Sequence, residues 1–284
     1  MLSRVPPVWL VVFGIVSVQL GAGIAKDLFD DAAPLTLVWL RLATSAVVLT
    51  VVVRPRLRGR AAADWRVALA FGVVLGTMNW AIYESFSRIP LGLAVTIEFL
   101  GPLGLAMTGS RRARDLLWVG LAAVGVALLG IERTHLDVAG VAFALLAGAM
   151  WSSYILLGAQ TGRRWPGLDG LTVASVVAAA GMAPFVAAFS GRGLGDPHVV
   201  LLGALVGLLS SVIPYSCEIT ALRTIRPAVF GILMSLEPAA AALAGVVVVH
   251  EYLSAAQWLA VACVVSASVG ATHTERRLAA PPLD

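Results

Sequence analysis

Five charged side chains interrupt long apolar stretches of this sequence. They are Arg41, Glu84, Glu98, Glu218 and Glu237. A charge withdrawn from water into apolar surroundings is costly unless it is paired, hydrated or neutralised by a proton. Such carboxyl groups can therefore bind an ammonium group, carry a proton or form a structural pair with an arginine.

The surroundings of these five residues favour different roles. Glu98 and Glu237 lie deep in apolar runs and close to prolines, which favours substrate or proton binding. Glu84 lies near the end of its run, where a structural or interfacial role is an equal alternative. Arg41 is either a structural counter-ion or a clamp for a carboxylate ligand.

Polar and aromatic residues gather in a few of the same apolar runs. They are Gln19, Asn79, Tyr83, Trp151, Ser152, Ser153, Tyr154 and Tyr215. Asn79 and Tyr83 are four residues apart, so they share one face of a helix. With one or two of the charges, such groups would hold a small zwitterion. Each could instead be an interfacial aromatic or a bond between helices.

Three prolines lie inside apolar runs: Pro102, Pro214 and Pro238. A proline within a helix frees a backbone carbonyl, which a ligand or a neighbouring helix can satisfy. These positions are candidate helix breaks beside a site, and a simple packing kink is the alternative.

Several chemistries have no support in the sequence. The apolar runs contain no paired aspartates, no G-x-S-x-G serine and no H-E-x-x-H motif, and no phosphate-binding P-loop is present. The histidines share no metal spacing; they are His135, His198, His250 and His273. Cys217 and Cys263 lie in apolar runs and are expected to be small core residues. We therefore expect no catalytic residue, no cofactor and no metal.

The composition is that of a membrane protein. Of 284 residues, 59% are hydrophobic and 13% are charged, and the mean hydropathy is +0.91. A soluble domain could not cover so much apolar surface, whereas lipid can surround it. Spans of about 20 apolar residues are predicted at 8–26, 34–53, 67–87, 91–109, 116–131, 138–158, 170–190, 198–216, 227–249 and 256–272. Ten spans are expected, and nine or eleven remain possible because several turns are tight.

The basic residues predict the orientation of these spans. With the N-terminus inside, fifteen of the 20 lysines and arginines fall in cytoplasmic segments and four fall outside, while Arg41 lies in a span. Positive residues favour the cytoplasmic side, so both termini are predicted there. A nucleic-acid patch would not alternate loop by loop. The first span also resembles a signal peptide that ends near Ala25, but its removal would break the repeat described next.

The two halves of the chain resemble each other. WVGLAAVGVALLG at 118–130 corresponds to WLAVACVVSASVG at 258–270, and Glu84 corresponds to Glu218. Glu98 with Pro102 corresponds to Glu237 with Pro238. Because each half has an odd number of spans, the halves must be inverted in the membrane, which is typical of secondary transporters working by alternating access. The predicted units are residues 1–133, residues 134–273 and a short cytoplasmic tail at 274–284.

Longer segments resemble a known family. They are PPVWL at 6–10, QLGAGIAKDLF at 19–29, IPLGLAVTIEFLGPLGLAM at 89–107, SRR at 110–112, WSSYILLG at 151–158, IPYSCEITAL at 213–222 and FGILMSLEPAAAALAG at 230–245. Across nearly the whole chain, these segments resemble the threonine/homoserine exporter branch of the EamA-type drug/metabolite transporters. Glu84 and Arg88 depart from that resemblance, because uncharged residues would be expected there.

The resemblance implies a multi-pass inner-membrane carrier that exports small amino acids, driven by the proton motive force. Broad drug or metabolite efflux is the alternative. Lipid, a small-molecule substrate and protons are the implied partners, without nucleic acid. The resemblance places the site in a central cavity at these positions: Gln19, Lys26, Asn79, Tyr83, Glu98, Trp151, Tyr154, Tyr215, Glu218 and Glu237. Arg41 joins them as a candidate from its charge alone.

Overall fold

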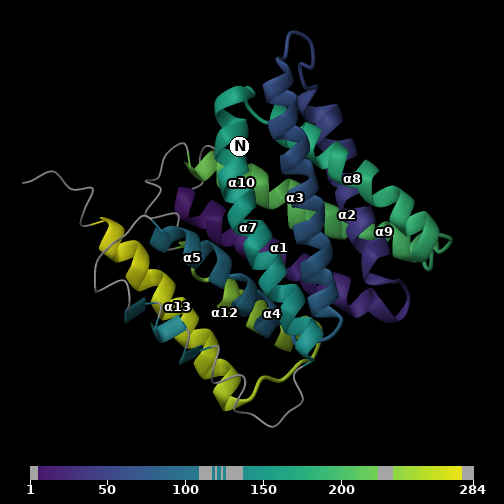
Figure 1. Cartoon of the computed structure of the whole chain (residues 1–284). Coiled ribbons are helices and arrows are strands. Elements are labelled where there is room, and N and C mark those ends of the chain that lie inside the picture. The colour runs from purple at the N-terminus through teal and green to yellow at the C-terminus, as the bar shows by residue number, and fades with distance from the viewer. Residues whose placement is uncertain are drawn as a thin grey trace, which may run out of the picture.

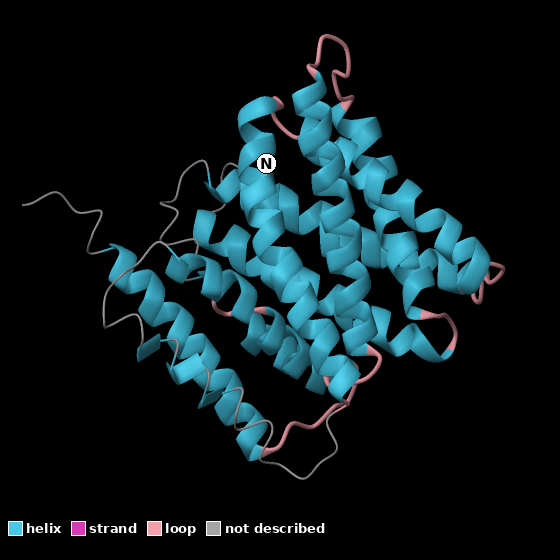
Figure 2. Cartoon of the chain, viewed as in Figure 1, coloured by secondary structure: helices cyan, strands magenta, loops and turns pink. Residues whose placement is uncertain are grey.

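The computed structural model describes residues 6–108, 117–118, 120–122, 124–125, 137–222 and 233–276. Throughout these residues the chain is helical, with turns and loops but no strand (Figure 2). The helices form a bundle in which α13 lies along one edge (Figure 1). The ten predicted spans imply an all-helical protein, and this architecture is confirmed for the described part of the chain.

The first part of the chain forms α1 (Pro7–Asp27), the short 3₁₀ turn η2 (Leu28–Asp30), α2 (Pro34–Val53), α3 (Ala62–Phe86), α4 (Leu91–Glu98) and α5 (Leu100–Thr108). The second part forms α7 (Val138–Arg164), α8 (Asp169–Phe189), α9 (Pro197–Gly207), the π-helical turn η3 (Leu208–Val212), α10 (Ile213–Leu222), α12 (Glu237–Val248) and α13 (Ala255–Arg276).

Six of the described helical segments are long and apolar enough to cross a membrane. They are Pro7–Asp30, Pro34–Val53, Ala62–Phe86, Val138–Arg164, Asp169–Phe189 and Pro197–Glu218. Shorter apolar helices cover Leu91–Leu105, Glu237–Val248 and Ala255–Gly270. Most of the span predicted at 116–131 lies outside the described residues, as do His135 and the beginning of the span predicted at 227–249.

Local sequence explains where many helices begin and end. Proline occupies the first turn of α1, α2 and α9, where its missing N–H costs nothing. The carboxylate of Asp137 caps α7 by accepting from Gly140 N at 3.0 Å. Asp64 caps the first turn of α3 by accepting from Ala61 N, so α3 begins five residues before the predicted residue 67.

The span predicted at 91–109, with a candidate helix break at Pro102, consists of two helices. The helix is interrupted at Phe99, so α4 ends at Glu98 and α5 begins at Leu100. Pro102 has no N–H to donate to the carbonyl of Glu98 four residues earlier, which explains the interruption. The span predicted at 198–216 is longer than expected and contains the π-helical turn η3 immediately before Pro214.

Helices from the two parts of the chain pack on each other. α3 packs against α7 and α8, while α1 packs against α10 and α2 packs against α8 and α9. α4 packs against both α7 and α12, and α1 also contacts α12. The crossing of α4–α5 with α7 is close because Gly101 and Gly148 meet there. A Cβ atom added at Gly148 would lie 2.5 Å from the carbonyl oxygen of Glu98.

Polar contacts tie together connections at each end of the bundle. At one end, Arg164 pairs with Asp64 at 3.2 Å, and Asp169 Oδ2 accepts from Arg56 N at 3.1 Å. At the other end, Lys26 pairs with Glu251 at 2.6 Å. The first group belongs to segments predicted on one side of the membrane, and the second to segments predicted on the opposite side.

Candidate functional site

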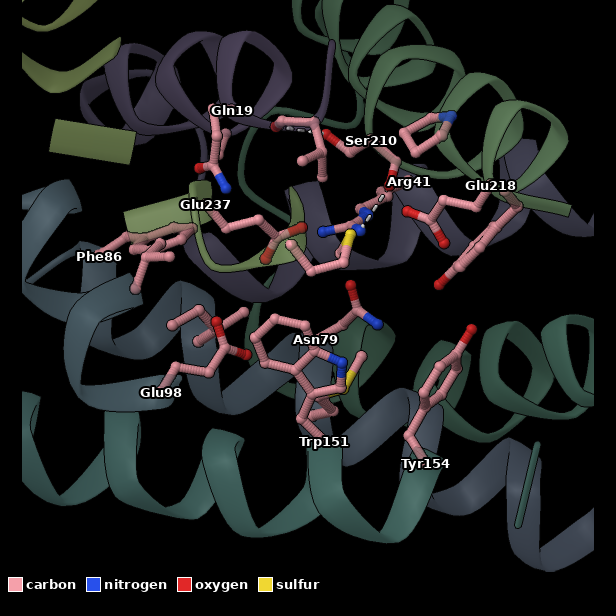
Figure 3. A pocket seen from close by; sticks show the side chains of 18 residues that line it. Gln19, Arg41, Asn79, Phe86, Glu98, Trp151, Tyr154, Ser210, Glu218 and Glu237 are labelled. Carbon is pink, nitrogen blue, oxygen red and sulfur yellow. Dashed lines mark hydrogen bonds between the residues drawn. The ribbon is translucent and has the colours of Figure 1, made fainter. Parts of the chain in front are cut away.

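A cavity of about 130 Å³ lies among helices from both parts of the chain (Figure 3). Ten of the sequence-predicted residues line it: Gln19, Arg41, Asn79, Glu98, Trp151, Tyr154, Pro214, Tyr215, Glu218 and Glu237. A cavity needs roughly 10–15 Å³ to hold one water molecule, so this one has room for a molecule the size of a small amino acid.

Arg41 supplies the positive charge in the cavity. The side chain comes from the middle of α2 and is buried. Its Nη2 donates to the carbonyl oxygen of Ser210 at 2.9 Å, and its Nε donates to Ser211 Oγ at 3.2 Å. Its guanidinium carbon lies 5.8 Å from the centre of the Tyr83 ring. In the part of the chain that the structure describes, Arg41 makes no ion pair, so its remaining donors can serve a ligand.

Three carboxylates line the same cavity. Glu98 is the last residue of α4, Glu237 is the first residue of α12, and Glu218 lies in α10. The two helix-end glutamates are buried, and α4 and α12 pack directly on each other. Glu237 and Glu218 extend toward Arg41 from different sides (Figure 3). A positive group and several acidic groups in one small cavity suit a zwitterionic ligand.

Neutral polar groups complete the lining. Gln19 of α1 is 5% exposed, and its Oε1 has no hydrogen-bond partner among the described residues. Asn79 of α3 is also buried and donates from Nδ2 to the carbonyl oxygen of Leu75 at 2.8 Å. The Asn79 amide is therefore held by its own helix, whereas the amide oxygen of Gln19 accepts no hydrogen bond from the described residues.

Aromatic rings bound the cavity on one side. Trp151 of α7 packs edge-on against Phe99, the residue at which α4 ends, with ring centres 5.6 Å apart. Tyr154 and Tyr215 stack with ring centres 6.4 Å apart. A second cavity of about 340 Å³ also contains Tyr154, Tyr215 and Glu218 in its wall. It extends to Trp165, Gly167 and Leu168, in the connection between α7 and α8. The tyrosine pair thus stands between the two cavities.

Seven of the residues singled out in the sequence lie outside the lining of the central cavity: Lys26, Tyr83, Glu84, Pro102, Ser152, Ser153 and Pro238. Lys26 lies at the end of α1, where it pairs with Glu251 and donates to the carbonyl oxygen of Ile89 at 2.6 Å. Tyr83 lies behind Arg41 and is fully buried. Pro102 lies in α5, and Pro238 lies in the first turn of α12. Glu84, for which the sequence left a structural role as an equal alternative, pairs with Arg88 in the turn that follows α3.

Sequence reasoning did not identify three of the residues that shape this arrangement. Ser210 and Ser211 bind Arg41. In the sequence, the only feature that marks them is that they are two adjacent hydroxyl residues close to Pro214 in an apolar run. Glu251 accepts from Leu91 N at 2.8 Å as well as pairing with Lys26. Glu251 is the first carboxylate after the apolar run of α12, and this position at the end of a span could have identified it as a partner for a basic residue at the same end.

The helical bundle and its charged internal cavity define a membrane transporter. The sequence profile of the EamA-like transporter family matches residues 138–272. The threonine/homoserine exporter RhtA of Salmonella typhimurium (strain SL1344) is 40% identical over 283 residues, covering 97% of this chain and 95% of the relative. RhtA of Escherichia coli (strain K12) is 40% identical over 282 residues, covering 96% of this chain and 95% of the relative. The chain belongs to the EamA-like transporter family.

A solved crystal structure shares the fold. It aligns with a TM-score of 0.66 and covers 95% of this chain and 99% of its own, at 19% sequence identity. At that identity the likeness concerns the fold alone. The arrangement of helices is therefore found in a second protein, while the contents of the cavity are those of this sequence.

Proposed function

We propose that this protein exports small amino acids of the threonine and homoserine type across the inner membrane. The observation that carries the proposal is the central cavity, whose wall contains Arg41 together with Glu98, Glu218 and Glu237. An amino acid presents a carboxylate and an ammonium group close together, and this lining offers a partner for each. The 40% identity to RhtA exporters over nearly the whole chain supports the same substrate class.

Broad efflux of drugs or metabolites is the competing function. Such a carrier needs a large and mainly apolar cavity that tolerates varied shapes. The central cavity has a volume of about 130 Å³ and contains four ionisable side chains in its wall besides its two tyrosines. Its size and charge favour a small polar substrate.

Transport in this proposal follows alternating access between two inverted repeats, residues 1–133 and 134–273, each with five spans. The packing pattern supports the repeats. Exchanging α1 with α7, α2 with α8, α3 with α9–α10 and α4 with α12 converts the α3–α7 packing into α1–α10, α3–α8 into α2–α9 and α4–α7 into α1–α12. The same exchange leaves the α2–α8 and α4–α12 packings unchanged. The family profile also matches residues 138–272, which is nearly one proposed repeat. The substrate cavity lies between the repeats, as expected for this architecture.

Both termini lie in the cytoplasm in the proposed topology. Support comes from the basic loop 54–61, which meets the α7–α8 connection through Arg60 and Arg164: Arg60 Nη1 donates to the Arg164 carbonyl oxygen at 3.3 Å. These arginine-rich connections share one end of the bundle. Positive residues collect on the cytoplasmic side, so that end is the inner one.

The described conformation suits substrate entry from the cytoplasm. The second cavity shares Tyr154, Tyr215 and Glu218 with the wall of the central cavity and extends to the α7–α8 connection at the proposed inner end. At the opposite end, Lys26 and Glu251 tie α1 to the α12–α13 connection and to the beginning of α4. We assign this ion pair to the closure of the outer side, which must open for release.

Protons are the proposed coupling ion. The buried carboxylates Glu98 and Glu237 are the candidate carriers, because a buried carboxyl group that exchanges a proton can couple that proton to substrate binding. Both stand at helix ends within the membrane region, where two short helices contact each other. Discontinuous helices of this kind form the substrate and ion sites of other secondary transporters.

The decisive experiment is efflux from cells preloaded with dipeptides of threonine, homoserine, valine and alanine. Expressing cells should release threonine and homoserine faster than cells with an empty vector, and a protonophore should remove the difference. If no amino acid leaves faster, the exporter proposal fails. If structurally varied drugs leave as fast as amino acids, broad efflux replaces it.

A further inference from the structure

We propose that Gln19 recognises the side-chain hydroxyl of the transported amino acid. This inference rests on the proposed function and assigns one determinant of specificity within its site. The Gln19 side chain lies in the wall of the central cavity (Figure 3). It is 5% exposed, and its Oε1 has no hydrogen-bond partner in the described part of the chain.

A buried polar atom without a partner is unusual in a folded protein and calls for a physical reason. In a transporter, the reason can be a ligand that supplies the missing hydrogen bond. Asn79 offers a useful contrast, because its amide donates to the Leu75 carbonyl at 2.8 Å and so is held within α3. The glutamine amide has no such anchor among the described residues.

Charge decides which part of the substrate meets Gln19. The substrate carboxylate is attracted to the Arg41 guanidinium, and the ammonium group to the carboxylates of Glu98, Glu218 and Glu237. A neutral amide competes poorly for either ion. A hydroxyl group remains, and it both donates and accepts, so it can satisfy the oxygen or the nitrogen of the amide.

The position of Gln19 is fixed relative to Arg41 by one structural element. Ser17 Oγ donates to the carbonyl oxygen of Leu209 at 2.7 Å, which joins α1 to the turn η3. A Cβ atom added at Gly21 would overlap Ser210 Oγ, so α1 and η3 are in close contact. Arg41 is bound to the same Ser210 through its carbonyl oxygen. The hydroxyl site and the carboxylate site are therefore held at a set separation.

This arrangement predicts discrimination against 2-aminobutyrate, which lacks the hydroxyl of both threonine and homoserine. A site that hydrogen-bonds a substrate hydroxyl rejects the analogue without it, since the protein group is then left unpaired. The purified full chain in proteoliposomes should transport threonine at least about tenfold more efficiently than 2-aminobutyrate. Gln19→Leu should bring the two substrates within about twofold of each other, mainly by losing threonine transport.

The matched control is Ser153→Ala. Ser153 lies on α7 outside the cavity lining, and its Oγ donates to Ala149 within its own helix. This variant should keep the wild-type ratio of threonine to 2-aminobutyrate. Gln19→Met serves as a second variant if Gln19→Leu inserts poorly into the membrane, because methionine is unbranched like glutamine and longer than leucine. Protection against thermal unfolding by each amino acid supplies a second measurement, in which threonine should protect the wild type more.

The inference is overturned if the wild type transports or binds both substrates equally. It is also overturned if the Gln19 variants keep the wild-type ratio, or lose both substrates by the same factor. A wild type that transports none of the amino acids is a different result, because it removes the proposed function itself.

Discussion

Arg41 of α2 is bound to the backbone of Ser210: its Nη2 atom donates to the Ser210 carbonyl oxygen at 2.9 Å. That carbonyl belongs to the π-helical turn η3, in the second part of the chain. The positive group of the cavity is therefore held between the two proposed repeats. A substrate carboxylate at Arg41 would act directly on the contact between them, which links binding to the movement of one repeat against the other.

Arg41→Lys is predicted to lower amino-acid transport at least about tenfold. Lysine keeps the positive charge but lacks the planar fork that can hold Ser210, Ser211 and a carboxylate at once. Initial rates over a range of threonine concentrations in proteoliposomes would measure the loss, and most of it should be an increase in KM. Arg88→Lys is the control, because Arg88 pairs with Glu84 outside the cavity. Equal rates in the Arg41 variant and the wild type would exclude a substrate contact.

Glu98→Gln and Glu237→Gln are each predicted to reduce proton-driven export at least about tenfold while leaving protein levels normal. Glutamine preserves the shape of each side chain but cannot carry a proton or a negative charge. Driven export and threonine exchange without a gradient should both be measured. A residue that only carries the proton keeps exchange, whereas one that holds the ammonium group loses both activities.

Glu84→Gln is the control for these two variants. Glu84 of α3 pairs with Arg88 four residues later, in the turn just after the helix, and lies outside the lining of the central cavity. Its replacement should leave driven export within about twofold of the wild type, since exposed pairs of this type contribute little. Undiminished driven export in both Glu98→Gln and Glu237→Gln would remove these carboxylates from the proton and substrate path.

The Lys26–Glu251 pair is predicted to behave as one unit in export. Lys26→Glu and Glu251→Lys alone should each impair export, because like charges then meet beside the beginning of α4. Combining them restores opposite charges, so the double variant should recover much of the activity. Export rates of the four proteins form a double-mutant cycle, with an expected coupling of about 1–3 kcal/mol. Additive losses would mean that the pair does not control the outer side.

The same exchange at Glu84 and Arg88 provides a matched control. That pair lies at the same end of the bundle, but it joins the last turn of α3 only to the turn that follows it and not to another helix. Its coupling should stay below about 0.5 kcal/mol. A coupling as large as that of Lys26 and Glu251 would show that charge at this end, rather than the connection between helices, affects export.

Much of the architecture could be predicted because a run of about 20 apolar residues is a strong indication of a membrane-spanning helix. The span predicted at 34–53 has the same bounds as α2, and the start at residue 138 is that of α7. The apolar run through Phe99 is continuous, so the sequence predicted one span there. Pro102 was a candidate helix break, but the sequence could not decide between a break and a simple packing kink.

The cavity was predictable to the extent that charge in an apolar run is costly. That rule selected Arg41, Glu84, Glu98, Glu218 and Glu237, and all of them except Glu84 line one cavity. Lys26 was a candidate only through the family resemblance, and it lies at the end of α1, where it pairs with Glu251. The charge rule could not select Ser210 either. Ser210 binds Arg41 through its backbone carbonyl, a group that every residue has.

Gly148→Ala is predicted to destabilise the protein by about 1–3 kcal/mol. Its new Cβ atom would lie 2.5 Å from the carbonyl oxygen of Glu98, so α7 and α4 would have to separate. Gly101→Ala should act in the same direction, because its Cβ would overlap the Gly148 carbonyl. Gly104→Ala is the control: nothing lies within 4 Å of a Cβ there, and alanine favours the helix.

Thermal unfolding of the purified variants in detergent measures these differences. Gly148→Ala and Gly101→Ala should unfold at lower temperatures than the wild type, and Gly104→Ala at the same or a higher temperature. Because Glu98 ends α4 at this crossing, Gly148→Ala should also lower driven threonine export by more than Gly104→Ala does. Equal unfolding temperatures for all three variants would contradict the close approach of α7 to the break in α4–α5.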